Sequence, residues 1–180
     1  MASPRPRGAE QALQATDADW TIVRSAWFHQ NFDEGHFVEP VRAGVIELPV
    51  GSVEEPFVDA DDVADVAVAA LTENGRHIGE LYEVTGPRML TFADAAAEIA
   101  QATGQPLRYI PISAQEYREL LTEQQLPPEL VELIVELFTV VLDGRNEHLT
   151  NGVQRALDRE PRDFRDYARA AAATGVWSPA

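Results

Sequence analysis

Residues 16–31, with the sequence TDADWTIVRSAWFHQN, decide the class of fold. The run from Trp20 to Val23 is rich in β-branched and aromatic residues, which predicts a strand. Residues 8–16 have the composition of a helix, and the acidic stretch at residues 17–19 separates that helix from the strand. A helix that leads directly into a strand is a unit from which α/β domains are built.

Residues 45–75 continue the alternation. Two short strands are predicted at residues 45–48 and 56–58, with Pro49 and Gly51 in the turn between them. The helix that follows has apolar residues at helical spacing and aspartates in its first turn, where the helix dipole favours negative charge. The apolar positions are Val63, Val66, Ala67, Ala70 and Leu71, and the aspartates are Asp59, Asp61 and Asp62.

Two further strands, each followed by a capped helix, are predicted at residues 80–85 and 107–112. In a capping box, a serine or threonine hydroxyl and the acidic side chain three residues later each accept a bond from the other residue's backbone N–H. The boxes are Thr91 with Asp94 and Ser113 with Glu116, and the first helix should end at Gly104. Strands that alternate with helices predict a partly parallel sheet flanked by helices.

The last third of the chain is richer in helices. A helix that opens at Pro127 and Pro128 is apolar on one face, which should pack on the core or on a partner. Its apolar positions are Leu130, Leu133, Ile134, Leu137, Phe138 and Val141. Two short helices separated by Pro161 should follow. We therefore predict an α/β core over residues 1–112 and a helical substrate-lobe or interaction region over residues 113–180, packed together as one compact unit.

Composition limits the classes of function. The 180 residues suffice for one domain with a sizeable core. A net charge of −16 repels nucleic-acid phosphates and anionic lipids, so neither is an expected partner. No stretch resembles a membrane span or a signal peptide. The chain has no cysteine, which excludes disulfides, thiolate nucleophiles and thiolate metal sites and agrees with a cytoplasmic location.

The basic residues and the glycines exclude two kinds of phosphate site. All 14 basic residues are arginine, so the chain has no lysine for a Walker phosphate loop or for a Schiff base. The eleven glycines nowhere form the G-x-G-x-x-G arrangement that lets a backbone approach a pyrophosphate. Any dinucleotide would therefore have to be held without the usual glycine loop.

Three stretches, in this order and spacing, resemble one protein family. They are residues 10–31 (EQALQATDADWTIVRSAWFHQN), residues 56–71 (PFVDADDVADVAVAAL) and residues 79–104 (GELYEVTGPRMLTFADAAAEIAQATG). The pattern is similar to the C-terminal two thirds of the NmrA-like atypical short-chain dehydrogenase/reductase family of NAD(P)-binding proteins. This resemblance implies a truncated Rossmann-like fold and oxidoreductase ancestry.

The resemblance also implies where a ligand binds. Open α/β sheets bind ligands at the carboxyl ends of their strands. Residues 21–24 are then a central strand whose end brings Trp27, Phe28 and Asn31 to a small organic substrate and Ala26 to a cofactor.

Charged and titratable side chains near this strand are candidates for the chemistry. Arg24 could contact a cofactor phosphate with its planar guanidinium, or it could form a structural salt bridge. His29 and His36 are candidate general acids or bases, because histidine titrates near neutral pH and the resemblance places their loop at the active face. The same histidines could bind a metal with Asp33 and Glu34, but the spacing fits no metal motif, and we predict no metal site.

Departures from the family leave several functions open. In the family, a glycine-rich strand and helix come before the strand that contains Arg24, and this sequence does not show them. The tyrosine–lysine pair of typical short-chain dehydrogenases cannot form without lysine. The implied cofactor is NAD(P), with hydride transfer through the usual residues in doubt. Alternatives are a noncatalytic NmrA-type regulator or interaction module, and a cofactor-free enzyme on the same scaffold. The natural reading frame could also extend upstream of Met1.

A sheet without half of its strands exposes an apolar edge and face. We therefore predict that the chain forms a homodimer or that a partner polypeptide covers this side.

Overall fold

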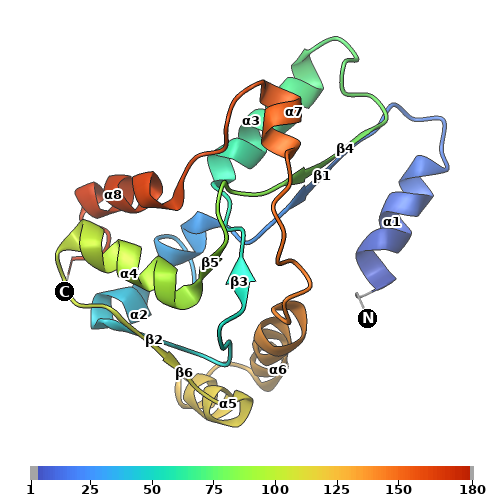
Figure 1. The fold of residues 1–180 in the computed structure, drawn as a ribbon. Helices are drawn as coiled ribbons and strands as arrows, with labels where there is room; N and C mark the ends of the chain where they lie inside the picture. The colour runs from blue at the N-terminus through green and yellow to red at the C-terminus, as the bar shows by residue number, and fades with distance from the viewer. Residues whose placement is uncertain (1–3, 179–180) are drawn as a thin grey trace.

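Two separate pairs of short parallel strands lie among the helices, one beside α3 and α7 and the other beside α5 (Figure 1). The computed structural model describes residues 4–178. β1 (Thr21–Ser25) pairs in parallel with β4 (Glu80–Val84), and β2 (Val45–Leu48) pairs in parallel with β6 (Arg108–Pro111). The predicted α/β class with a partly parallel sheet is confirmed.

A third pair of strands corrects one prediction. β3 (Glu54–Glu55) pairs antiparallel with β5 (Leu90–Thr91). The proline after β3 has no N–H to donate to a ladder, which ends the strand there. The backbone pairs again at Val58, through an isolated parallel bridge to Phe28. The strand predicted at residues 56–58 is therefore wrong.

Two helices cover the β1–β4 pair. α3 (Ala60–Thr72) packs on β1, and α7 (Gly152–Leu157) packs on α3 and on β4. The aspartates before α3 act partly as predicted, because the Asp59 carboxylate caps the helix by accepting the N–H of Asp61 at 2.9 Å. α1 (Pro4–Gln14) precedes β1 and begins and ends earlier than the sequence pattern predicted.

Both predicted capping boxes are present. At the start of α4 (Phe92–Thr103) and of α5 (Ala114–Glu123), the N-cap hydroxyl accepts the backbone N–H of the residue three positions later. The carboxylate of that residue accepts the backbone N–H of the N-cap residue. The pairs are Thr91 with Asp94 and Ser113 with Glu116. α4 ends at Gly104, which takes the left-handed conformation.

The remaining helices complete the core. α6 (Pro128–Glu136) continues into a π-helical turn, η2 (Leu137–Val141), and α8 (Phe164–Thr174) packs along α4. A short 3₁₀ helix, η1 (His29–Phe32), and α2 (Val38–Ala43) connect β1 to β2. No helix within residues 4–178 is long and apolar enough to cross a bilayer.

The larger hydrophobic cluster is rich in aromatic rings that come from distant parts of the sequence. Phe32, Phe57 and Phe92 meet Phe164 of α8 and Phe138 of η2. Side chains on both sides of residue 112 therefore share this cluster, and the domain boundary proposed there stays a prediction. A smaller cluster fills the space between the β1–β4 pair, α3 and α7 with Val58, Val66, Tyr82, Val84, Val153 and Ala156.

Candidate substrate cavity

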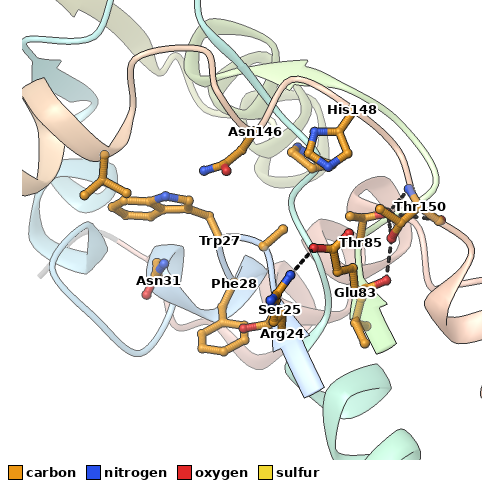
Figure 2. Close-up of a pocket in the computed structure, with 14 residues that line it drawn as sticks. Arg24, Ser25, Trp27, Phe28, Asn31, Glu83, Thr85, Asn146, His148 and Thr150 are labelled. Atoms are coloured by element: carbon orange, nitrogen blue, oxygen red, sulfur yellow. Dashed lines mark hydrogen bonds and ion pairs between the residues drawn. The ribbon is translucent and has the colours of Figure 1, made fainter. Parts of the chain in front are cut away.

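A cavity of about 380 Å³ lies at the carboxyl ends of β1 and β4 (Figure 2). Two parallel strands end at the same edge of a sheet, which is where open α/β folds bind ligands. The lining side chains come from β1 and the segment after it, from the end of β4, and from the segment before α7. They are Arg24, Ser25, Ala26, Trp27, Phe28, Asn31, Pro56, Glu83, Val84, Thr85, Val141, Asn146, His148 and Thr150.

One wall of the cavity is aromatic and lies where the sequence predicted it. The Trp27 ring packs against Phe138 with 5.3 Å between ring centroids, and edge-to-face against Phe92 at 6.3 Å. Phe28 lines the cavity and is partly exposed, and its backbone is fixed by the bridge to Val58. Figure 2 shows Asn31 on the same side as Trp27. Trp27, Phe28, Asn31, Ala26 and Arg24 are thus brought together at one cavity, and the binding roles assigned to them stay predictions.

The opposite wall is polar and was not found from the sequence. The Thr150 N–H donates to the Thr85 hydroxyl at 3.1 Å, and the Thr150 hydroxyl donates to the Glu83 carbonyl. Asn146 and His148 lie between this wall and Trp27 (Figure 2). Thr85 is the last residue of the strand predicted at residues 80–85, so the strand-end rule could have found it. The segment that carries the other residues has no periodic pattern that would place it beside β1.

Arg24 forms the salt bridge that the sequence left as one of two alternatives. Its Nε donates to Glu10 at 2.9 Å and its Nη1 donates to Glu83 at 2.8 Å. These two carboxylates raise the pKa of Arg24 above its usual range. Because two negative charges already neutralise the guanidinium, its attraction for a phosphate is weakened.

His29 does not line the cavity, because its ring is inside the core. The side chain is fully buried, and Nε2 lies 2.9 Å from the Phe57 carbonyl oxygen. The ring packs edge-to-face on Phe164 and beside Tyr167, while Nδ1 lies 3.6 Å from Asp59. A catalytic role for His29 stays a prediction that this buried position does not favour.

His36 also points elsewhere. Its Nε2 lies 2.9 Å from the Tyr117 hydroxyl, and its ring contacts Phe37 and Phe138. Burial lowers the pKa of His36, so the ring is neutral near pH 7. The structure does not bring His36 to Trp27 or to the cavity, and its catalytic role is likewise untested.

The acidic residues near these histidines have partners of their own. Asp33 accepts a hydrogen bond from the Tyr167 hydroxyl at 2.7 Å. Asp62 and Asp65 bind arginines that precede α8, Arg159 and Arg162. Across residues 4–178, no group of three or more histidine, aspartate or glutamate side chains is arranged to hold a metal ion.

The residues at the cavity do not fit a whole dinucleotide. Arg24 carries the permanent positive charge of the lining, and it is paired with carboxylates of which Glu83 itself faces the cavity. The chain has no G-x-G-x-x-G loop to receive a diphosphate.

Comparisons with known proteins point to one group. No protein-family profile matches the chain. It is 32% identical over 165 residues to an NAD(P)H azoreductase of Xenophilus azovorans, a match that covers 91% of this chain and 57% of the azoreductase. Its fold matches triphenylmethane reductase of a Citrobacter species with a TM-score of 0.80 at 20% identity, over 93% of this chain and 57% of that one.

A third comparison involves a protein that is described as a regulator. The negative transcriptional regulator NmrA, solved with NAD, matches with a TM-score of 0.59 at 16% identity, over 92% of this chain and 58% of that one. The fold is therefore Rossmann-like. The chain spans little more than half the length of the relatives it matches.

Proposed function

This chain belongs to the NmrA-like family of NAD(P)-binding proteins and has oxidoreductase ancestry, and from that premise we propose that its cavity binds a small planar organic molecule. The observation that carries the proposal is the cavity itself, which opens where β1 and β4 end and has Trp27 as a wall. Its volume lies within the usual range for sites of small ligands, roughly 300–1,000 Å³.

The lining supports an aromatic ligand. Trp27 and Phe28 offer ring surfaces, and Asn31, Asn146 and His148 offer a few hydrogen-bonding groups around them. Such a mixture of apolar walls and few polar groups is typical of ligand sites. The similar azoreductase is named for azo compounds, and azo dyes carry aromatic rings, which agrees with this class of ligand.

Binding of a soluble azo dye to the purified chain tests the proposal by equilibrium dialysis. We expect saturable binding that weakens at least tenfold in Trp27→Ala and measurably in Asn31→Ala, because each removes part of the wall. Trp20→Phe is the matched control, since Trp20 lies outside this cavity and should leave the affinity unchanged. Equal dye binding by Trp27→Ala and the native chain would refute the proposal.

The proposal for the cofactor is narrower. We propose that the chain alone does not retain NADPH, because its cavity cation is already paired and it has no glycine loop. Titration followed by NADPH fluorescence should show no saturation up to millimolar concentration. Micromolar binding would instead support a dehydrogenase activity within this chain.

An interaction module is the second candidate, and it rests on the exposed side of α6. Val131 and Val135, which the predicted apolar face did not include, are buried, whereas Leu133, which it did include, is 61% exposed. Leu130, Leu137, Val140 and Val141 extend this exposed surface. Exposed apolar patches of this kind often bind other proteins. Leu133→Glu with Leu137→Glu should abolish association in this case, and persistence of the complex would count against it.

The open side of β1 supports a partner as well. Trp20 accepts the N–H of Gly79, and Ala26 donates to Val84, so the even-numbered residues of this strand face β4. Alternate residues of a strand direct their backbone groups to opposite sides, which leaves those of Thr21 and Val23 facing away from β4. We propose that a strand of a second copy or of another polypeptide pairs with this edge.

A further inference from the structure

Glu55 of β3 is a buried acid without a matching partner. Its side chain is fully buried, and neither carboxylate oxygen has a hydrogen bond of good geometry within the described part of the chain. Burying an unpaired charge is costly, so such a group either binds a proton or has a role that justifies the cost. The dye-binding proposal does not involve Glu55.

The segment over residues 143–148 lies against Glu55 and also forms a wall of the cavity. The backbone N–H of Glu54 donates to Glu147 Oε1 at 3.0 Å, which fixes the segment to β3. Asn146 is next to the Glu55 carboxyl group and at the same time lines the cavity. One side chain therefore connects the buried acid to the binding surface.

Within the described residues, the charges that act on Glu55 come from two acids of the same segment. Glu147 and Asp143 face it from the segment, whereas Arg145 is engaged by Asp143 at 2.7 Å and by the Val140 carbonyl at 2.9 Å. β5, which pairs with β3, contributes uncharged residues at this position. Burial raises the pKa of Glu55 to about 7, the Asn146 amide opposes this rise, and the two acids add to it.

We propose that Glu55 is a positioning residue for the 143–148 segment: while its carboxyl group is protonated, the segment and its Asn146 pack on β3 against the cavity, and loss of that proton loosens this wall. By itself the Asn146 amide favours the carboxylate, but burial and the two acids of the segment outweigh it, so the packed segment favours the neutral acid. The carboxylate can only accept, and it would be a buried charge beside two other acids. Solvation of that charge requires the segment to move away from β3.

Trp27 provides a readout that needs no ligand, because it lines the same cavity as Asn146. The chain contains three tryptophans, so the protein labelled with 5-fluorotryptophan gives three ¹⁹F signals, and Trp27→Phe identifies the relevant one. We expect the Trp27 signal to shift with pH around a midpoint of about 7. In Glu55→Gln, which keeps the neutral shape, the signal should stay constant between roughly pH 5.5 and 8.5.

Two further variants make the result specific. Asn146→Ala should raise the midpoint, because it removes the group that favours the charged form of Glu55. His148→Gln should retain the midpoint, although His148 lines the cavity, because the proposal assigns the titration to Glu55. The proposal fails if the native signal does not titrate, if titration persists in Glu55→Gln, or if it disappears in His148→Gln. If Glu55→Gln does not fold, the Asn146→Ala variant tests the proposal instead: a raised midpoint supports it and a lowered or unchanged midpoint contradicts it. None of these outcomes affects the dye-binding proposal, which is tested by equilibrium dialysis.

Discussion

Gly152, the first residue of α7, lies so close to the backbone carbonyl of Glu83 in β4 that a Cβ atom on Gly152 would overlap the carbonyl oxygen. The same carbonyl accepts the Thr150 hydroxyl. The contact therefore holds both α7 and the polar wall of the cavity against the strand that ends there.

Gly152→Ala should destabilise the protein by about 1–3 kcal/mol, because backbone must move to admit the methyl group. Alanine otherwise favours a helix over glycine by up to about 1 kcal/mol, so a loss of stability would come from the overlap. Urea unfolding measures the change. Gly51→Ala is the control, since a Cβ at Gly51 meets open space. Equal stability of the two variants would contradict the packing described.

Glu55 should make stability fall as the pH rises. The pKa of glutamate is 4.5 in the unfolded chain and about 7 in the fold, so between these values the folded protein holds a proton that the unfolded chain has lost. The free energy of unfolding then decreases with increasing pH, by as much as roughly 3 kcal/mol in total. Glu55→Gln should therefore be more stable than the native protein at pH 8 and similar to it at pH 4.5. Parallel stability profiles of the two proteins would exclude this effect.

Asp59 should contribute in the opposite pH range. Burial raises its pKa, but the nearby His29 ring and the hydrogen bonds from the Asp61 N–H and Gln30 outweigh this and hold the pKa at about 2. The contribution is complete above the unfolded value of 3.8 and is lost as the pH falls toward 2.

At pH 7, Asp59→Ala should cost about 2–3 kcal/mol, which combines a lost helix cap with lost charge-assisted bonds. Asp61→Ala removes a neighbouring exposed acid and should cost less than about 1 kcal/mol. Thermal unfolding at pH 7 and pH 2.5 gives both differences. If the loss of stability caused by Asp59→Ala were as large at pH 2.5 as at pH 7, the titration of Asp59 described here would be wrong.

Local signals predicted most of the secondary structure because the residues that decide it are close in sequence. Thr91 with Asp94 and Ser113 with Glu116 lie three positions apart, and each pair alone determines where a helix begins. The strand predicted at residues 56–58 was wrong because the prediction relied on β-forming side chains. Pro56 has no N–H to donate to a ladder, and the strand ends before it.

The site was predictable only on one side. Trp27 and Asn31 follow a strand, so the strand-end rule placed them at the cavity. His29 is two residues from Trp27, yet the 3₁₀ turn directs its ring into the core toward Phe164. Asn146 reaches the cavity through tertiary packing, which no short-range pattern encodes.

The last prediction concerns association through the open side of β1. Leu71 is 86% exposed and Ile78 is 50% exposed, and both line an apolar groove with Trp20 and Val23 beside this strand. Because both side chains are exposed, Leu71→Glu with Ile78→Glu should leave the fold stable while placing charges on the surface that a partner would cover. Light scattering at rising concentration should show dimers of the native chain and monomers of this variant. Leu149→Glu, at an exposed leucine outside this groove, should still associate. If the native chain stays monomeric at every concentration, the homodimer is refuted and a different polypeptide is the partner to seek. If dimers persist in the variant with both charges, the interface lies elsewhere, and the exposed leucines of α6 are the next surface to test.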